Sequence, residues 1–164
     1  MSNTETVTVI DSPVRLDYTY TAGEATTRFL RGIAQHRIVG QTCPATGKVY
    51  VPPRGASPTH GVPTEGEVEI SDKGTVTTFC IVRIPAENLS VQPPFAAAHV
   101  LLDGADIPFF HVISECPLEE MRMGMRVEAV WVDDDEIGPT LRSIQYFRPT
   151  GEPDAPFESF QEHL

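Results

Sequence analysis

The sequence predicts a mainly β protein, in which a five-stranded barrel follows an N-terminal helix and a small turn-rich module. Apolar residues recur with a helical period only before residue 40, prolines and glycines crowd residues 40–66, and period-two alternation dominates after residue 67. These patterns predict four units along the chain: an N-terminal extension with a helix (1–39), the turn-rich module (40–66), the barrel (67–149) and a C-terminal tail (150–164).

The first predicted element is an amphipathic helix from about Gly23 to Gln35. Thr21 and Glu24 have the spacing of a capping box, in which both side chains satisfy free amides of the first helical turn. Residues 1–22 are otherwise polar, with a short extended piece expected from Val14 to Tyr20. The helical period rests on apolar residues at Phe29, Leu30, Ile33, Ala34 and Ile38.

The next segment, residues 40–66, holds five prolines and five glycines in 27 positions. Such a composition allows only turns and very short strands. The strand expected here is Lys48 to Val51, and Pro52 and Pro53 end it.

From residue 67 the alternation of apolar and polar residues indicates strands. Val68 and Ile70 alternate with acids, and a turn is expected at Asp72-Lys73-Gly74. Cys80 shares one face of the following strand with Val76, so it is expected to be a small core residue. The barrel strands are expected at Val76–Ile84, Phe95–Leu102, Ile107–Ile113, Met125–Trp131 and Leu141–Phe147.

The number and spacing of these strands favour a Greek-key barrel of the OB type. An immunoglobulin-like sandwich would need about seven strands. Asp103-Gly104 is a hairpin signal that makes two of the strands antiparallel neighbours.

Composition excludes several classes of function. The 164 residues carry a formal charge of -11, which repels a phosphate backbone and argues against nucleic-acid binding. No apolar run approaches the ~20 residues that span a bilayer, and the first residues lack the pattern of a signal peptide. Three widely spaced cysteines do not form a disulfide framework. A cytoplasmic protein is therefore expected.

The most informative segment is Cys43 to Gly61, which repeats the form x-P-x-x-G on either side of a short strand. Two zinc knuckles have this form, with ligands at the first and fourth positions and a glycine that lets the chain turn under the metal. The four ligand positions hold Cys43, Thr46, Ser57 and His60. Zinc prefers thiolate, imidazole or carboxylate ligands, so two hydroxyls predict a ribbon kept as a shape without its metal. Residual metal binding by the cysteine and the histidine is the alternative.

Six segments together resemble the DUF35 family of zinc-ribbon OB-fold proteins, over about Gly23 to Pro149. They are Phe29–Gly40, Val51–Gly55, Lys73–Phe79, Leu102–Ala105, Met123–Val127 and Tyr146–Pro149. The chain departs from the four-cysteine members of that family at Thr46, Ser57 and His60. The departure puts the metal in doubt and leaves the fold intact.

The resemblance implies a non-catalytic accessory subunit in a hetero-oligomer with a thiolase-superfamily enzyme that acts on acyl-CoA thioesters. The group it is most similar to serves retro-aldolases that shorten the CoA-linked side chains of steroids. No cofactor is expected, zinc included. The alternative function is a stand-alone module that binds acyl-CoA or lipid in a cleft between helix and barrel. The partner-binding residues are predicted on the helix and the ribbon edge: Phe29, Leu30, Ile33, Tyr50, Pro52, Pro53 and Arg54. These residues equally fit a simple packing of the ribbon on the barrel.

Few residues favour an enzyme that acts alone. A nucleophile needs a neighbouring base, and Cys43 with His36 or His60 is the only local set of that kind. His99 and His111 flank the predicted hairpin and either form a cross-strand metal pair or, as is commoner, are hydrogen-bonded strand histidines. No catalytic residue is therefore assigned.

Overall fold

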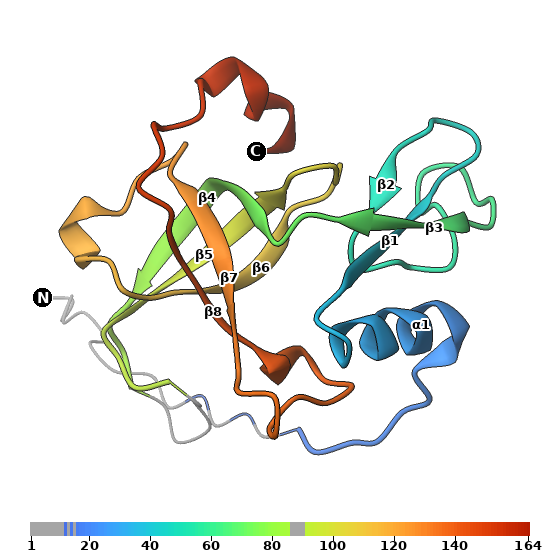
Figure 1. The fold of residues 1–164 in the computed structure, drawn as a ribbon, viewed down its shortest axis with the longest axis horizontal. Helices are drawn as coiled ribbons and strands as arrows, with labels where there is room; N and C mark the ends of the chain where they lie inside the picture. Colours follow the sequence, from blue (N-terminus) through green and yellow to red (C-terminus); the bar gives the residue numbers. More distant parts are fainter. Residues whose placement is uncertain (1–11, 13, 15, 86–90) are drawn as a thin grey trace, which may run out of the picture.

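The computed structural model describes residues 12, 14, 16–85 and 91–164. Its elements form two sheets, a small one beside the helix and a closed barrel (Figure 1). The helix is α1 (Gly23–Ile33), and short 3-10 turns are η1 (Leu118–Glu120), η2 (Leu141–Ser143), η3 (Phe157–Ser159) and η4 (Gln161–His163). The strands are β1 (Ile38–Thr42), β2 (Val49–Tyr50), β3 (Glu65–Ile70), β4 (Lys73–Val82), β5 (Phe95–Leu102), β6 (Phe109–Ile113), β7 (Arg126–Trp131) and β8 (Ile144–Pro149).

The barrel confirms the predicted fold class. Its strands follow the order β4-β5-β6-β8-β7, and the ring is closed by the antiparallel β4–β7 pair and a single parallel contact between Ile113 and Phe147. The expected strand from Leu141 begins later, because residues 141–143 form η2 and β8 starts at Ile144. β5 and β6 are antiparallel as predicted. Fully buried side chains such as Val76, Val127 and Phe147 fill the interior.

The side chains of β4 that point into the barrel are not all those that the sequence predicted. The register of β4 against β5 shifts between Val76 and Thr78, where a bulge inserts one extra residue. Thr77 is fully buried beside Val76, and the alternation beyond it is reversed. Cys80 is therefore exposed, which corrects the expectation of a core residue, and Ile81 packs against the core in its place.

Gly74 lies inside β4, whereas the sequence placed it in a turn. A side chain at this position would meet the carbonyl oxygen of Leu101 at 2.5 Å, so the glycine permits a close approach of β5. The connection between β3 and β4 consists of Ser71 and Asp72 alone.

The helix begins where predicted and ends at Ile33, two residues early. Its N-cap is Ala22 and no side chain caps it, so the predicted capping box is not formed, because Thr21 lies one position too far from the first turn. Ile38 belongs to β1 and not to the helical pattern. Phe29 and Ile33 are the buried face of α1 and join the core.

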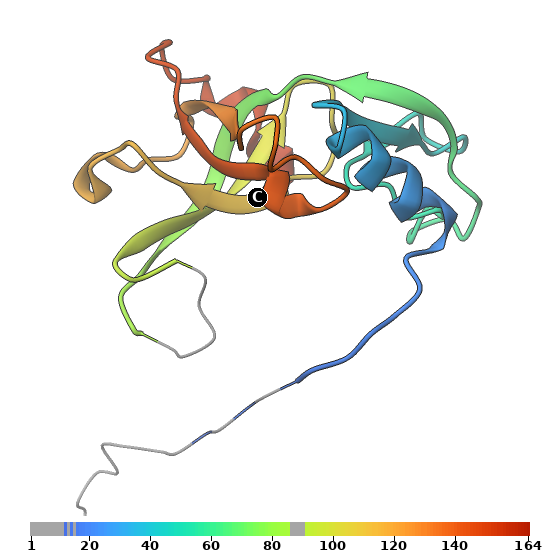
Figure 2. The ribbon, with the colours of Figure 1, turned by 60° about the horizontal axis from the view of Figure 1, so that its bottom comes forward.

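The small sheet has the order β2-β1-β3 and lies with α1 at one end of the molecule (Figures 1 and 2). β1 was not expected, because Ile38 was counted with the helical period and Gly40 to Thr42 with the turn-rich module. β3 pairs with β1 in the register Ile38–Ile70 and Val39–Glu69, and not with the barrel. The expected strand Lys48–Val51 is reduced to two residues. The segment from residue 38 to residue 70, which contains this sheet and its turns, is called the ribbon below.

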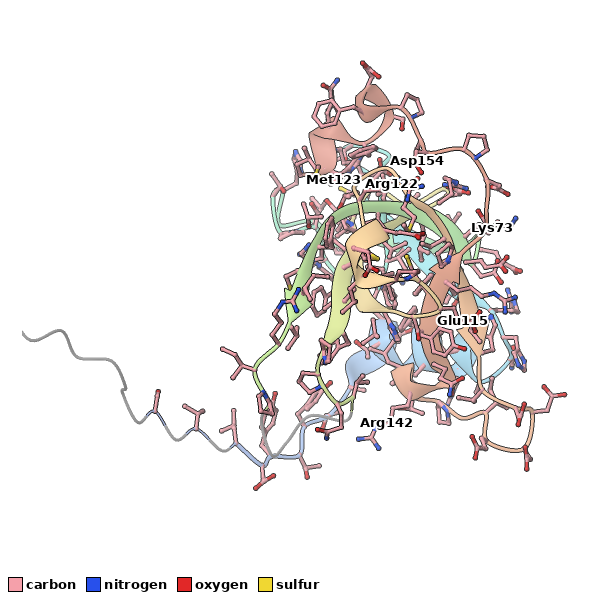
Figure 3. The ribbon with its side chains drawn as sticks, turned by 90° about the vertical axis from the view of Figure 1, so that its left-hand side faces the viewer. Lys73, Glu115, Arg122, Met123, Arg142 and Asp154 are labelled. Carbon is pink, nitrogen blue, oxygen red and sulfur yellow. The ribbon has the colours of Figure 1, made fainter. Side chains whose placement is uncertain are left out.

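The two ends of the chain behave differently. The expected extended piece from Val14 to Tyr20 forms no strand at its described positions, and the side chains of Leu16, Tyr18 and Tyr20 are exposed. Residues 150–164 fold across the barrel, where Phe160 is only 3% exposed. Figure 3 shows Arg122 beside Asp154, and their two hydrogen bonds of 2.6 and 2.8 Å fasten this segment.

Candidate functional site

The two knuckle-like turns of the ribbon have the backbone geometry that the sequence predicted. In the first, the amides of Thr46 and Gly47 donate to the carbonyl oxygen of Cys43 at 3.2 and 2.8 Å. In the second, the amide of Gly61 donates to the carbonyl oxygen of Ser57 at 2.9 Å. Gly47 and Gly61 have φ angles of 74° and 66°, which glycine adopts freely. The turns thus keep their shape although their side chains have changed.

The predicted ligand positions converge, and the Ser57 hydroxyl lies at their centre. Its oxygen is 3.2 Å from the Tyr50 hydroxyl and 3.4 Å from Nδ1 of His60. Hydrogen bonds from Ser57 and then Thr46 lower the pKa of the Cys43 thiol to about 7. Cys43 and Ser57 are buried, whereas the other two ligand positions face solvent. This group (Cys43, Thr46, Tyr50, Ser57 and His60) is called the ribbon cluster.

The ribbon cluster does not fit a closed tetrahedral zinc site. It offers one thiol and one imidazole, and its two remaining positions are neutral hydroxyls, which bind zinc poorly. In the described part of the chain, no three His, Cys, Asp or Glu side chains gather in a way that could hold a metal ion. The polar atoms of the ribbon cluster instead bond to one another.

The other residues suggested for catalysis do not form a reactive set. His36 lies 3.5 Å from Asp134 and stacks edge-on against Trp131, on the barrel side of the molecule. His99 pairs with Phe110 and His111 pairs with Ala98, so the two histidines lie on opposite faces and make no metal pair. The Nδ1 atom of His99 lies 3.0 Å from the Thr78 hydroxyl, as expected for a strand histidine.

His111 is the exception among the described polar side chains, because its Nδ1 atom is buried without a hydrogen-bond partner. Its ring contacts those of Phe109 and Phe147, at centroid distances of 5.8 and 5.6 Å. Burial lowers the pKa of His111, so the neutral form is favoured. His111 therefore packs against aromatic rings, and it is not placed as an acid, a base or a metal ligand.

The predicted partner-binding residues divide between core and surface. Phe29 and Ile33 are buried in the core, and Tyr50 is only 5% exposed, which corrects its placement on the surface. Pro53 is also buried, and Leu30 is half-buried against the core. The hydroxyl of Tyr50 turns inward because it bonds to Ser57. The exposed members of the predicted set are Pro52 and Arg54.

Asp106, in the loop between β5 and β6, joins the ribbon to the barrel. Its carboxylate accepts from the amide of Val49 at 2.8 Å, and its own amide donates to the carbonyl oxygen of Val49 at 2.9 Å. Nδ1 of His163 lies 3.1 Å from the carbonyl oxygen of Asp106. The sequence did not predict this role, because an aspartate after a hairpin signal is common in loops. Nothing near it in the sequence indicates that it bonds to a strand of the ribbon.

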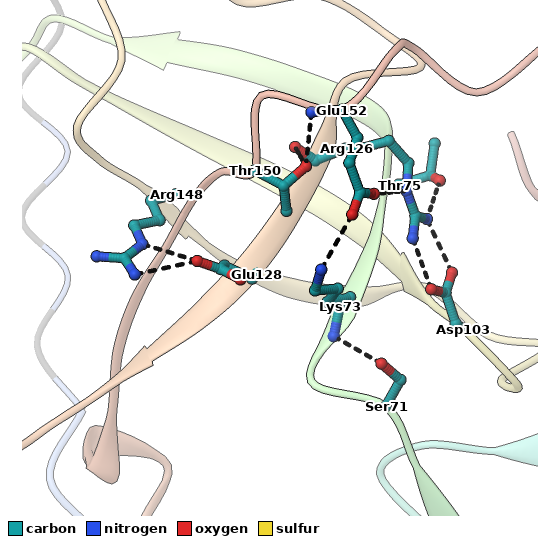
Figure 4. A network of polar contacts seen from close by, with 9 residues as sticks. All are labelled: Ser71, Lys73, Thr75, Asp103, Arg126, Glu128, Arg148, Thr150 and Glu152. Carbon is teal, nitrogen blue, oxygen red and sulfur yellow. Dashed lines mark hydrogen bonds and ion pairs between the residues drawn. The ribbon is translucent and has the colours of Figure 1, made fainter.

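A second unpredicted group surrounds Arg126 on β7 (Figure 4). Its guanidinium donates to both carboxylate oxygens of Asp103, at 2.8 and 2.6 Å, and to the Thr75 hydroxyl at 2.9 Å. Glu152 lies 3.5 Å from Arg126 and 3.0 Å from Lys73. Lys73 lowers the pKa of Glu152, and Asp103 raises the pKa of Arg126. The charges neutralise one another, so this group binds the tail to the barrel.

Two open grooves lie near these groups. One, of about 500 Å³, runs between the hairpin loop at Asp103 and the tail at Phe160. The other, of about 480 Å³, lies between the first turn of α1 and the ribbon, and carries Arg28, Arg54 and Glu65. The first is about half apolar, with Leu102, Ala155 and Phe160 in its wall, whereas the second is lined mainly by polar atoms and offers little of the apolar surface that an acyl chain requires. No helix in the described residues is long and apolar enough to cross a membrane.

Two family models match this chain. The rubredoxin-like zinc ribbon domain of ChsH2 matches residues 31–57, and the C-terminal OB-fold domain of ChsH2 matches residues 67–132. A DUF35 domain-containing scaffold protein of Methanocaldococcus jannaschii is 34% identical over 96 residues, which are 57% of this chain and 67% of the relative. A protein of the same description from Pyrococcus furiosus is 31% identical over 96 residues, 58% of this chain and 69% of the relative.

Solved structures share the fold. A structure described as an Ltp2-ChsH2(DUF35) aldolase superposes with a TM-score of 0.56 and 21% identity, over 74% of this chain and 91% of that one. A DUF35 protein of unknown function from Sulfolobus solfataricus superposes with a TM-score of 0.57 and 20% identity, over 77% of this chain and 84% of that one.

Proposed function

Because the chain belongs to the DUF35 family, we propose that it is a non-catalytic accessory subunit that docks on and supports a separate enzyme. The observation that carries the proposal is the similarity to two relatives that are each described as a scaffold protein. A scaffold needs a stable shape and a docking surface. It needs no reactive group of its own.

The chemistry of the candidate site supports this proposal. Ser57 holds the Tyr50 hydroxyl and the His60 ring in hydrogen bonds, and Cys43 is buried beneath them. A nucleophile must be open to its substrate and next to a base that is free to accept its proton. In the described residues, Ser57, Tyr50 and His60 are hydrogen-bonded to one another and are not free to react. The reacting groups in this proposal therefore belong to the partner.

The partner we propose is a thiolase-superfamily enzyme that acts on acyl-CoA thioesters, and most specifically a retro-aldolase of steroid side-chain degradation. The support is the match to both ChsH2 family models and the fold shared with the protein described as an Ltp2-ChsH2(DUF35) aldolase. In this assignment the chain meets acyl-CoA only through the complex. The alternative is a stand-alone module for acyl-CoA or lipid, and the groove beside α1, which carries Arg28, Arg54 and Glu65, does not favour it.

We further propose that the ribbon folds without zinc. The support is the chemistry of the donor set, since Thr46 and Ser57 stand where a closed site needs two strong ligands. The ribbon then contributes its shape to the complex, and the metal is not needed to maintain that shape.

The test is co-expression with a thiolase-like protein from the same organism. We expect the two proteins to purify as one complex and aldolase or thiolase activity to appear only in that complex. Cleavage of an acyl-CoA thioester by this chain alone would contradict the non-catalytic assignment. A partner that is fully active and stable without this chain would contradict the accessory role.

A further inference from the structure

The outer surface of β4, β5 and β6 is free of Asp, Glu, Lys and Arg over most of its length. Ala96 and Ala98 belong to the core, so the residues between and beside them on β5 point outward. The strand register then places the outward side chains in rows across the three strands. These residues, called the Phe110 face, are Thr78, Cys80, Val82, Phe95, His99, Phe110 and Val112, and Ala97 lies buried among them.

Phe110 is the most exposed aromatic side chain of this face, at 61%. Its ring lies edge-on to that of His99, at a centroid distance of 5.2 Å. The Nδ1 atom of His99 is in turn 3.0 Å from the Thr78 hydroxyl. The aromatic ring is therefore held in place before any partner arrives. A rigid, exposed aromatic residue of this kind is typical of a binding hot spot.

The opposite outer surface of the same barrel shows that low charge is not general. On β7 and β8, Arg148 pairs with Glu128 at 3.0 Å, and the Arg126 group adds further ion pairs (Figure 4). Charged residues make up 21% of the whole chain. The centres of protein interfaces are depleted in charged residues and enriched in aromatic ones, whereas surfaces that face only water carry charge.

The Phe110 face continues into an open strand edge. β4 pairs with β7 only through Lys73, Gly74 and Thr75. In the described residues, the part of β4 that carries Cys80 and Val82 has no strand on that side (Figure 1). An apolar strand with a free edge is a template for association unless a partner covers it.

The net charge selects the kind of partner. A formal charge of -11 repels nucleic acid and anionic lipid, and it opposes the stacking of a second copy of the same chain. A protein with an apolar patch and a neutral or basic rim is attracted by the same charge.

Resting on the proposed function, we propose that the Phe110 face is the surface on which the thiolase-type subunit docks. The partner covers Phe110 with apolar side chains and shields the free edge of β4. Cys80, on β4 at the edge of the face, is buried by the contact.

The test compares the Phe110→Lys and Val82→Lys variants with Gln145→Lys, which places the same charge at an exposed position of β8. Binding of a thiolase-like protein from the same organism is measured by calorimetry, and folding is checked by thermal unfolding. A charge at the centre of an interface removes a hot-spot contact, so Phe110→Lys is expected to weaken binding about 30-fold or more. Gln145→Lys is expected to bind like the wild type.

A second measurement uses the thiol of Cys80 in a Cys116→Ser background. Cys80 is exposed in the free chain, and Cys43 is buried. We expect a maleimide to label Cys80 in the free chain and to react far more slowly in the complex. Equal labelling in both states, or equal binding by all three lysine variants, would overturn the assignment of the face and leave the accessory function standing.

The two proposals fail in different ways. If the wild-type chain does not bind the thiolase-like protein at all, the proposed function fails and the docking surface fails with it. If sedimentation shows that the wild type is a dimer and that Phe110→Lys is a monomer, the face joins two copies of this chain, which also overturns the docking proposal.

Discussion

The interior of the barrel and the ribbon cluster stabilise the same chain in different ways. In the barrel, fully buried Val76, Val127 and Phe147 belong to one apolar core that extends to Phe29 of α1. In the knuckle turns, the residues at the centre are polar, and Ser57 joins Tyr50 and His60 through its hydroxyl. Apolar contact is additive over many atoms, whereas a polar cluster depends on the geometry of a few bonds. The barrel should therefore determine the global stability of the fold, and the ribbon cluster should determine only the local order of the ribbon.

The largest effect is expected from Phe147→Ala in the barrel. The side chain is fully buried at the parallel contact between β6 and β8, so its loss leaves a cavity at the point where the ring closes. Such truncations cost about 3–5 kcal/mol. Chemical denaturation should show one cooperative transition of lower midpoint, in which ribbon and barrel unfold together. Separate transitions would contradict a shared core.

Rebuilding the metal site should have the next largest effect. The double variant Thr46→Cys with Ser57→Cys would place three thiols and one imidazole on turns that already converge. Zinc at 1,000 times its dissociation constant would then stabilise the fold by about 4 kcal/mol. Metal content and thermal unfolding with and without a chelator measure this. The wild type serves as the control and should not respond to the chelator; a wild-type loss of stability on chelation would contradict a zinc-free ribbon.

A smaller effect is expected from Asp106→Ala at the junction. The substitution removes the acceptor of the Val49 amide, which is partly buried, so the cost should lie near the lower end of the range of about 1–3 kcal/mol for an unsatisfied buried donor. Because this hydrogen bond joins the ribbon to the barrel, its loss should accelerate hydrogen exchange in β2, while the barrel strands stay protected. Asp135→Ala, which removes the same carboxylate from an exposed position between β7 and η2, is the control. Uniform acceleration across both regions would indicate a global and not a local effect.

The smallest expected effect is a pH dependence from the thiol of Cys43. Its pKa is lowered from 9.0 to about 7 by hydrogen bonds from Ser57 and Thr46, so the folded state favours the thiolate. The unfolded chain binds the proton more tightly between these values, and stability therefore rises from pH 7 to pH 9 and is lost as the pH falls back to 7. Melting temperatures of the wild type and Cys43→Ser across this range measure the effect. Parallel curves would contradict it.

Much of the fold could be predicted from local pattern. The five barrel strands, the helix and the two knuckle turns each depend on residues close together in the sequence. The predictions went wrong where a contact distant in sequence decides the outcome. The bulge at Thr77 reverses the faces of β4 and brings Cys80 to the surface, and it arises from the register against β5. β3 pairs with β1, although its alternation is the same as that of a barrel strand.

The candidate site shows the same division. The spacing of Cys43, Thr46, Ser57 and His60 predicted four converging positions, because a knuckle is a local turn. The inward placement of Tyr50 was not predictable, since it depends on the second knuckle turn folding against the strand. The bond from the Val49 amide to Asp106 was not predictable either, since the two residues are 57 positions apart. The same holds for Arg126, whose carboxylate partners come from the hairpin loop and from the tail.

The sequence by itself determined the class of fold, the form of the ribbon and its poor set of zinc ligands, because periodicity, turn residues and ligand chemistry are properties of neighbouring positions. The tertiary structure alone decided that hydrogen bonds to Ser57 occupy the centre of the ribbon, that the tail folds back on the barrel, and that one barrel surface is uncharged. These features depend on which strands meet and in which register, and pairing energy is known only once both partners are in place.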